Sequence, residues 1–399
     1  MTFDIETLKE RACLKIDSIA QDLVEASHTI HENPELNYEE FLASELLVRL
    51  ANKHGLVTER DVFGCETGFV ADTGSGPTVC VMSEYDALPV IGHGCGHNII
   101  ATAGLGAAIG LSAVASDAGG RLRYLGTPAE EGGGGKLVMA RNGALQGVDI
   151  AMMVHSADAD LTTIDAIALQ QLLVEYDGEA AHAAAAPEKG KNALDAAVLG
   201  YMAVSALRQH ILPTERVHGI FVRGGSKPNI VPHDAATEWY VRSDTMSSLQ
   251  ELKPRVLAAL ESGAHACGCS VRHQWDQNPY ADMVTNNNIS AMYISNAARL
   301  GREVTVPGTK GHRVVGSTDM GNISHLVPSI HPMISSAPAG TAIHTTAFEK
   351  ASRSPQADQA VIDGAKAMAM TAIDYWTSPE QQKAISEEFA RTNASRDVL

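Results

Sequence analysis

The sequence predicts an α/β protein in which a helix-flanked mixed sheet is interrupted by an inserted α+β domain. Helix-like and strand-like segments alternate through the first half of the chain, which is typical of a sheet covered by helices. The middle of the chain then follows the order strand, helix, strand, strand, helix, strand, which is the split-βαβ (ferredoxin-like) pattern. At 399 residues the chain is long enough for about two or three domains with buried cores.

The elements of the first half follow from the spacing of apolar residues. Helices are expected over residues 5–27, 39–54, 97–116 and 136–143. Strands are expected within residues 77–89, over 121–125 before a polar loop that runs to 131, and over 148–156. In folds of this kind functional groups gather at strand ends, so the polar residues after these strands are the first candidates for a site.

The inserted domain is expected over residues 168–281, which leaves 1–167 and 282–399 to the first domain. Its elements are a strand over 166–180, a helix over 193–209, strands over 217–225 and 236–244, a helix over 247–266 and a strand over 269–277.

Charge and composition exclude several classes of partner. The net charge of −17 disfavours nucleic acid and anionic membrane surfaces. No apolar run has the length of a transmembrane helix, and residues 1–23 indicate a charged amphipathic helix rather than a signal peptide. The six cysteines lack regular spacing, which favours reduced thiols and a cytoplasmic location over a disulfide scaffold.

Cysteine, histidine and glutamate side chains stand at the ends of several expected elements. In GHGCGHN, residues 92–98, Cys95 and His97 lie among glycines, where the backbone can approach another group closely. Such side chains hold zinc-like ions. The further candidates are Glu130, Glu131, His155 and His344.

Each of these residues also has an ordinary structural interpretation. A single histidine is more often a surface or hydrogen-bonded residue, and we interpret His93, His312, His325 and His331 in that way. A Glu–Glu pair is usually solvated, and a cysteine between glycines can be small and buried. The set as a whole favours a metal site, because the loop GTPAEEGGGGK has no other evident need for two carboxylates.

A two-metal site would use these side chains in different ways. One of two adjacent carboxylates binds metal while the other takes a proton from the attacking water. A thiolate can bridge two ions about 3.5–4 Å apart, since metal binding deprotonates it. Because Cys95 stands just before an expected helix N-terminus, its pKa is expected to fall further.

Longer motifs stand in a defined order along nearly the whole chain. They are IHENPELNYEE (30–40), SEYDALPVIGHGCGHN (83–98), GTPAEEGGGGK (126–136), YDGEAAHAAAAPEKGKNALDAA (176–197), GSTDMGNISHLVPSIHP (316–332) and IHTTAF (343–348). In these motifs the chain resembles the di-metal aminoacylase and carboxypeptidase-type metallopeptidases. The resemblance implies a phosphorylase/hydrolase-like catalytic domain with an inserted lid or dimerisation domain.

The resemblance also implies a metal centre and a second protomer. It implies two divalent ions, zinc or manganese with cobalt as a third candidate, held by Cys95, His97, Glu131, His155 and His344. Glu130 matches the general base and proton shuttle of the family, and Asp86 matches a supporting acidic residue beside the first motif.

His182 matches a lid histidine that reaches the active site of a partner subunit, so a homodimer or higher homo-oligomer is expected. Asn229 and Arg242 are candidates for holding a substrate carboxylate.

The first metal motif selects a branch of the family. It reads Glu84-Tyr85-Asp86 instead of a His-x-Asp pair, and Cys95 stands where a bridging carboxylate would be expected. This pattern resembles the amidohydrolases, which include hippurate hydrolase, auxin-conjugate hydrolases, p-aminobenzoyl-glutamate hydrolase and β-alanyl dipeptidase-like enzymes. Asn98 resembles the last two of these more than the hippurate type.

The expected activity is therefore metal-dependent hydrolysis of the amide bond in a small N-acyl amino acid, dipeptide or aryl-amino acid conjugate. Three alternatives remain open at the level of the sequence. The same metal site could remove an amine hydrolytically, the chain could be an inactive dimeric binding module, or Cys95 could act as a nucleophile.

Overall fold

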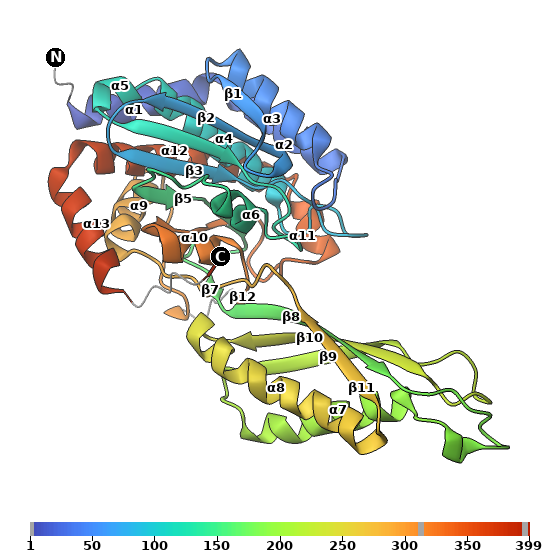
Figure 1. Ribbon diagram of the computed structural model, residues 1–399. Coiled ribbons are helices and arrows are strands. Elements are labelled where there is room, and N and C mark those ends of the chain that lie inside the picture. The colour runs from blue at the N-terminus through green and yellow to red at the C-terminus, as the bar shows by residue number, and fades with distance from the viewer. Residues whose placement is uncertain (1–3, 310–314, 393–397) are drawn as a thin grey trace. The chain divides into compact units, whose positions relative to one another are not determined.

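The computed structural model describes residues 4–309, 315–392 and 398–399. His312 therefore lies outside the described residues. The chain forms two compact units, one built from residues 4–165, 283–309 and 315–392 and the other from Ala166–Asp282. In Figure 1 the second unit is the green to yellow part of the chain from β8 to β11. None of the helices in these residues combines the length and apolar composition that crossing a membrane requires.

The first unit contains helices from both ends of the chain around a mixed sheet. Its helices are α1 (Ile5–Ser18), α2 (Ala20–Glu32), α3 (Phe41–Lys53), α4 (His97–Ser112), α5 (Ala115–Ala118), α6 (Gly135–Arg141), α9 (Asn287–Ala298), α10 (Met320–Leu326), α11 (Thr346–Ala351), α12 (Pro355–Thr377) and α13 (Pro379–Arg391). Its strands are β1 (Thr58–Val62), β2 (Cys65–Gly74), β3 (Thr78–Ser83), β4 (Arg121–Gly126), β5 (Ile150–Met152), β6 (His155–Ala157), β12 (Val315–Gly316), β13 (Ser329–Ile330) and β14 (Met333–Ser335), and β7 (Asp165–Ala166) crosses into the second unit.

The main sheet has the strand order β1-β2-β4-β3-β5-β13. The strands β4, β3, β5 and β13 run parallel, whereas β1 and β2 pair antiparallel at one side. Apolar residues on both faces of the sheet are buried. One face packs on α4 and α12 through Val81 and Tyr124, and the other packs on α6 and α10 through Cys80 and Met82. This sheet, covered on both faces, confirms the predicted fold class.

The position of α4 depends on a glycine. This helix is apolar around its whole circumference and is buried along nearly its whole length, as expected for a helix that packs on several neighbours. A Cβ atom at Gly104 would lie 2.2 Å from the Ser83 Oγ and 2.7 Å from the Met82 carbonyl oxygen. The glycine thus lets α4 lie directly on β3, and the N-terminal residue of α4, His97, comes close to the C-terminal end of that strand.

Three predicted elements differ from the structure. The helix predicted over 5–27 is two helices, because Ile19 has φ −117° and ψ 8° and breaks the helical path between α1 and α2. The helix predicted over 97–116 ends at Ser112. The strand predicted over 148–156 ends at Met152, and His155 starts the separate strand β6, which pairs with β14.

The second unit has the predicted order strand, helix, strand, strand, helix, strand. Its elements are β8 (Ala168–Asp177), α7 (Ala193–Leu207), β9 (Arg216–Arg223), β10 (Asp234–Ser243), α8 (Met246–Cys267) and β11 (Ser270–Trp275), with short 3-10 turns at Pro187–Lys189 and Arg208–His210. The strands form an antiparallel sheet in the order β11-β8-β10-β9. A Cβ atom at Gly263 would lie 2.1 Å from the Ala196 carbonyl oxygen, so this glycine allows α7 and α8 to pack closely.

Candidate metal centre

The parallel strands of the first unit bring polar residues to one edge of the sheet. Because β3, β4 and β5 run in the same direction, the residues that follow their carboxyl ends lie near one another. Glu84 and Asp86 follow β3, Glu130 and Glu131 follow β4, and His155 comes shortly after β5.

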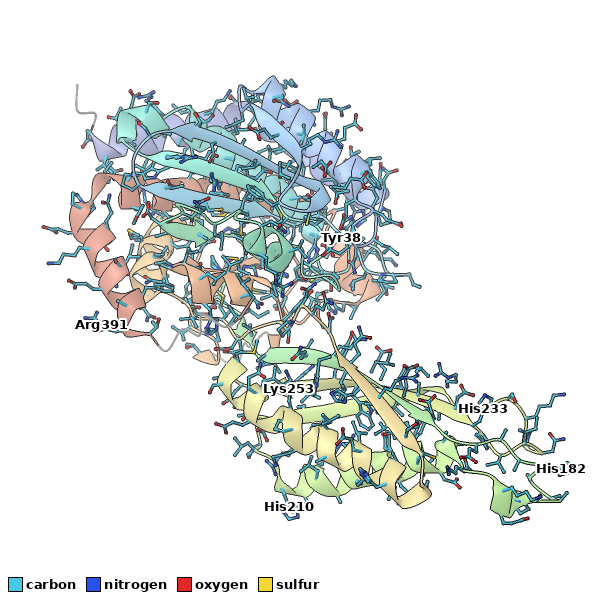
Figure 2. All side chains as sticks on the ribbon, in the orientation of Figure 1. Tyr38, His182, His210, His233, Lys253 and Arg391 are labelled. Atoms are coloured by element: carbon cyan, nitrogen blue, oxygen red, sulfur yellow. The ribbon has the colours of Figure 1, made fainter. Side chains whose placement is uncertain are left out.

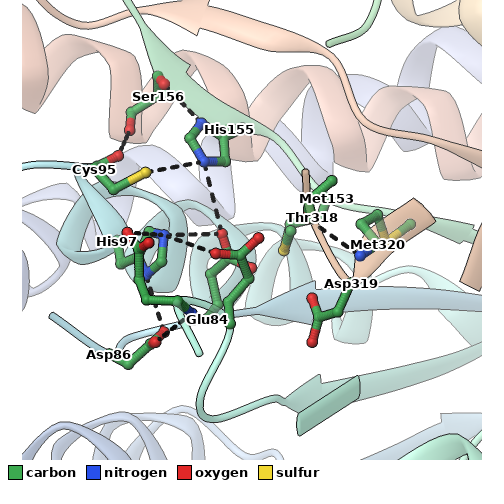
Figure 3. Close-up of polar contacts among 12 residues, drawn as sticks. Glu84, Asp86, Cys95, His97, Met153, His155, Ser156, Thr318, Asp319 and Met320 are labelled. Carbon is green, nitrogen blue, oxygen red and sulfur yellow. Dashed lines mark hydrogen bonds and ion pairs between the residues drawn. The ribbon is translucent and has the colours of Figure 1, made fainter. Parts of the chain in front are cut away.

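The glycine-rich loop brings Cys95 to this edge. Gly96 has φ +76°, and a Cβ atom there would lie 2.2 Å from the Ser156 Oγ. The same Ser156 hydroxyl donates a hydrogen bond to the Cys95 carbonyl oxygen at 2.6 Å. As a result the Cys95 Sγ lies 3.6 Å from the His155 Nε2, as Figure 3 shows. Only glycine fits this close approach, which gives a physical reason for the bare backbone of GHGCGHN.

The structure brings all five predicted metal ligands together. Their donor atoms form two groups, in each of which all atoms lie within 4.8 Å of one another. Cys95 belongs to both groups, and the pairs that complete them are His97 with His155 and Glu131 with His344.

The buried polar atoms of the site fit a bound metal. Within the described residues, Glu84 Oε1, His97 Nε2 and Glu131 Oε1 are buried and have no hydrogen-bond partner. Buried polar atoms without partners are energetically costly and rare. Thiol, imidazole and carboxylate donors that converge in this way are those that bind zinc-like ions. Divalent ions bound by the two donor groups would satisfy these atoms.

Asp86 contacts two of the predicted ligands. Its Oδ1 lies 3.0 Å from the His97 Nδ1, and its Oδ2 accepts a hydrogen bond from the Glu131 backbone N–H at 2.8 Å. An acceptor at Nδ1 leaves the His97 Nε2 free to bind a metal. This geometry fits the supporting role expected of Asp86.

Glu130 belongs to a third group of donor atoms that lie within 4.8 Å of one another, which it forms with Glu84 and His97. Its Oε2 is 3.9 Å from the His97 Nε2. Burial raises the pKa of Glu130 well above its usual range, and the negative charges of Glu84 and Glu131 act in the same direction. The preceding residue, Ala129, has φ +58°, and its N–H donates to the buried carboxylate of Glu40 at 2.9 Å. The backbone of this loop is therefore held in an unusual conformation by a residue of the first motif.

The expectation of a lowered Cys95 pKa is wrong for the metal-free chain. Burial, followed by the charge of Glu131, raises the pKa of this thiol well above its usual value. The desolvation of the thiolate thus outweighs the effect of the helix N-terminus. A protonated thiol is a poor nucleophile, so the geometry disfavours Cys95 as a nucleophile and leaves a metal ion as the group that would deprotonate it.

Sequence reasoning missed a buried charged cluster beside the ligands, which we call the Lys136 cluster and which consists of Glu84, Lys136 and Asp319. The Lys136 Nζ lies 2.6 Å from the Glu84 Oε2 and 2.7 Å from the Asp319 Oδ1, and all three side chains are 0% exposed. Burial acts to raise the pKa of Glu84, but Lys136 and three histidines outweigh it and lower the pKa to about 2. Burial raises the pKa of Asp319 to about 6. The lysine at the end of GTPAEEGGGGK is the one feature of the sequence that could have indicated this cluster.

Two histidines that we interpreted as ordinary are buried next to the site. His331 packs edge-on against the His155 ring at 5.3 Å, and its Nδ1 lies 3.2 Å from the Met153 carbonyl oxygen. His93 stacks on His31 at 6.2 Å. Burial lowers the pKa of both His331 and His93 to about 3, so both rings are neutral near pH 7.

The remaining predicted residues belong to the second unit, and Figure 2 labels His182 at one end of it. His182 is exposed on the loop before α7 and pairs with Ile230 in an isolated bridge, next to the exposed Asn229. Arg242 lies on β10, partly buried, and stacks on the Tyr240 ring at 5.8 Å. Burial lowers the pKa of Arg242.

A mixed sheet that carries a converging set of thiol, imidazole and carboxylate donors is typical of metal-dependent hydrolases. Comparison with family models gives a match to Peptidase family M20/M25/M40 over residues 80–374, which is most of the chain. The chain therefore belongs to this family, and the resemblance predicted from the motifs is confirmed.

Individual relatives support the same assignment. The Xaa-Arg dipeptidase of Mus musculus is 38% identical, over 97% of this chain and 93% of its own length. One of the subunits of the p-aminobenzoyl-glutamate hydrolase of Escherichia coli (strain K12) is 32% identical, over 70% of this chain and 62% of its own. A solved Bacillus subtilis structure, described as a dinuclear metal binding peptidase from the M20 family, has a TM-score of 0.66 at 19% identity. The superposition covers 89% of this chain and 99% of the Bacillus subtilis chain. At this identity the similarity shows the fold alone.

Proposed function

We propose that this protein hydrolyses the amide bond of small N-acyl amino acids, dipeptides or aryl-amino acid conjugates at a pair of divalent ions. The observation that carries the proposal is that Cys95 belongs to both donor groups, with Glu130 beside them. Membership of a peptidase family and the similarity to a dipeptidase support this substrate class. The similarity to an Xaa-Arg dipeptidase makes dipeptides ending in arginine the first substrates to test.

The proposed roles follow from the placement of each group. When bound, the ions polarise the scissile carbonyl and lower the pKa of the attacking water. Glu130 takes a proton from that water and delivers it to the leaving nitrogen, a role that is supported by its position beside the donor groups, 3.9 Å from the His97 Nε2. His182 stabilises the oxyanion, and Asn229 and Arg242 hold the substrate carboxylate. Within the described residues the Arg242 Nε is buried without a partner, which supports a role in binding an anion.

We propose that residues 1–167 and 282–399 form the catalytic domain and residues 168–281 a lid and dimerisation domain. The proposed partner is a second copy of this chain. The edge strand β9 exposes Ile220 at 62%, and the helix α7 exposes Met202 at 61%. An exposed apolar edge strand favours pairing with another strand, so these surfaces support a homodimer.

The proposed ions are zinc or manganese, with cobalt as a third candidate. The Cys95 thiolate and the three imidazoles favour zinc, whereas the Glu131 carboxylate also suits manganese. The proposed location is the cytoplasm, which is supported by the six free thiols, Cys13, Cys65, Cys80, Cys95, Cys267 and Cys269.

The test is turnover of a substrate panel by metal-reconstituted protein, with separate assays for released amino acid and ammonia. The panel contains Xaa-Arg dipeptides, β-alanyl dipeptides, N-acyl amino acids and aryl-glutamate conjugates. Release of an amino acid supports the proposal, release of ammonia alone favours the hydrolytic deaminase, and metal binding without any turnover favours the binding module.

Two matched variants separate the roles of the adjacent carboxylates. Glu130→Gln is expected to lower kcat by about 10²–10⁴-fold while both ions stay bound. Glu131→Gln is expected to lose an ion as well as activity. Near-normal turnover of Glu130→Gln with metal bound would refute the role of the base. Mixing His182→Ala with Glu130→Gln protein tests the trans arrangement, since a mixed dimer would regain activity only if His182 acts on the partner's site.

A further inference from the structure

The Glu84 carboxylate belongs to the third donor group, which it forms with His97 and Glu130, although none of the predicted roles involves it. Its Oε1 is 3.4 Å from the His97 Nε2 and 3.9 Å from the His155 Nε2. The side chain is 0% exposed, and within the described residues Oε1 has no hydrogen-bond partner. Figure 3 shows Glu84 pointing toward the same space as Cys95, His97 and His155.

The shorter of these separations matches that between ligands of one ion. With ion–ligand bonds of about 2.0–2.3 Å, two ligands of a tetrahedral zinc lie about 3.3–3.8 Å apart. The Cys95 Sγ to His155 Nε2 distance of 3.6 Å falls in that range. The Glu84 Oε1 to His97 Nε2 distance of 3.4 Å also falls in it. The distance of 3.9 Å from the same oxygen to the His155 Nε2 is longer than the upper limit of about 3.5 Å for two nitrogen or oxygen ligands of one zinc. A direct hydrogen bond does not explain the contact with His97, because 3.4 Å is long for one and the His97 Nε2 is likewise without a partner among the described residues.

The other two residues of the Lys136 cluster hold this carboxylate in place. The Lys136 Nζ binds the Glu84 Oε2, the oxygen that faces away from the histidines. Asp319 accepts hydrogen bonds from both the Lys136 Nζ at 2.7 Å and the Lys136 backbone N–H at 3.0 Å. The lysine reaches this position because a Cβ atom at the preceding Gly135 would lie 1.9 Å from the Pro128 carbonyl oxygen, so the backbone passes where only glycine fits.

We propose that Glu84 is a fourth protein ligand for the ion held by Cys95, His97 and His155, and that Lys136 and Asp319 fix its carboxylate for this purpose. The inference rests on the two-ion site of the proposed function. It makes the two ions unequal. One ion is surrounded by four buried protein ligands, which is typical of a closed zinc site. The other has Cys95, Glu131 and the half-exposed His344, which leaves a position open for water and substrate.

The test is Co²⁺ binding to the metal-free protein, followed by absorption spectroscopy and by metal analysis of the dialysed samples. Glu84→Gln keeps the shape of the side chain and leaves Lys136 paired with Asp319. We expect its affinity for one of the two ions to fall by about 100-fold or more, because loss of a supporting residue alone already weakens binding 10–100-fold. We also expect the ligand-field bands of that ion to move.

The matched control is Asp363→Asn, since Asp363 is also a buried carboxylate with a cationic partner, Arg302 at 2.9 Å. It should bind both ions as the wild type does.

Each outcome decides a different point. If Glu84→Gln binds both ions with wild-type affinity and an unchanged spectrum, the inference is overturned and the proposed function stands. If the wild-type protein binds no metal, the proposed function itself fails. The circular dichroism of the metal-free protein reports folding. Should Glu84→Gln not fold, Glu84→Asp applies the same criteria, since it keeps the charge but shortens the side chain by one methylene and withdraws it from the ion.

Discussion

Removal of the Lys136 charge should destabilise the metal-free protein strongly. Lys136 lies 2.6 and 2.7 Å from two carboxylates, and all three side chains are fully buried. Breaking a buried ion pair by removal of one partner costs about 3–5 kcal/mol, because a buried charge is left uncompensated. In Lys136→Met two carboxylates lose their partner, so the upper half of this range is expected. For a unit of this size, that loss lowers the unfolding midpoint by about 7–9 °C.

The assay is thermal unfolding of chelator-treated protein with an exposed lysine as the matched control. Lys53 contacts Asp22 at the same distance of 2.6 Å, but its side chain is 56% exposed. Exposed ion pairs contribute about 0–1 kcal/mol, so Lys53→Met should shift the midpoint by a few degrees at most. Equal shifts for Lys136→Met and Lys53→Met would mean that burial makes no difference to the strength of the ion pair, contrary to what we expect.

Three further predictions concern the loops around the site and its metal. Gly96→Ala should lose both bound metal and stability, because its Cβ would clash with Ser156. The control Gly119→Ala, with φ +69° and no atom within 4 Å of the new Cβ, should lose only a little stability. Metal analysis and thermal unfolding of both variants measure these effects. Burial, followed by the charge of Asp86, raises the pKa of Glu40 from its usual value near 4.5 to about 7. The stability that the protonated carboxyl contributes is thus present below about pH 4.5 and lost as the pH rises through about 7. Glu40→Gln should therefore gain stability relative to the wild type between about pH 5 and 8, and a constant difference in unfolding midpoint would contradict this. Removal of the metal by a chelator should lower the unfolding midpoint of the wild-type protein. Returning the metal should raise the midpoint again in a concentration-dependent way, since a ligand of the folded state stabilises it by mass action. Calorimetry at several metal concentrations measures this.

The sequence predicts the fold well because periodicity survives in most elements. The alternating run of β8 and the apolar run of β3 each indicate a strand, and both are observed. Prediction fails where the backbone changes direction without a change in composition. Ile19 breaks one apolar helical pattern into two helices, and the run from 148 to 156 is divided between two sheets by pairing with different strands. Pairing of this kind depends on distant residues and has no local signal.

The metal ligands of the candidate site can be predicted from the sequence more readily than the residues that support them. Cys95 and His97 are recognisable because their residue types and glycine neighbours are unusual in sequence, and His155 because it ends an expected strand. Glu84, Lys136 and Asp319 are ordinary charged residues that are separated by up to 235 positions, and only folding brings them into contact. The raised pKa of Cys95 was missed for a related reason, since the helix N-terminus can be read locally but the burial of the thiol cannot.

Anomalous diffraction from crystals of the zinc-loaded protein shows directly whether Cys95 joins two ions. We expect two ions about 3.5–4 Å apart, each within bonding distance of the Cys95 Sγ. Zinc bound elsewhere, or a single ion that does not touch Cys95, would rule out the two-ion site.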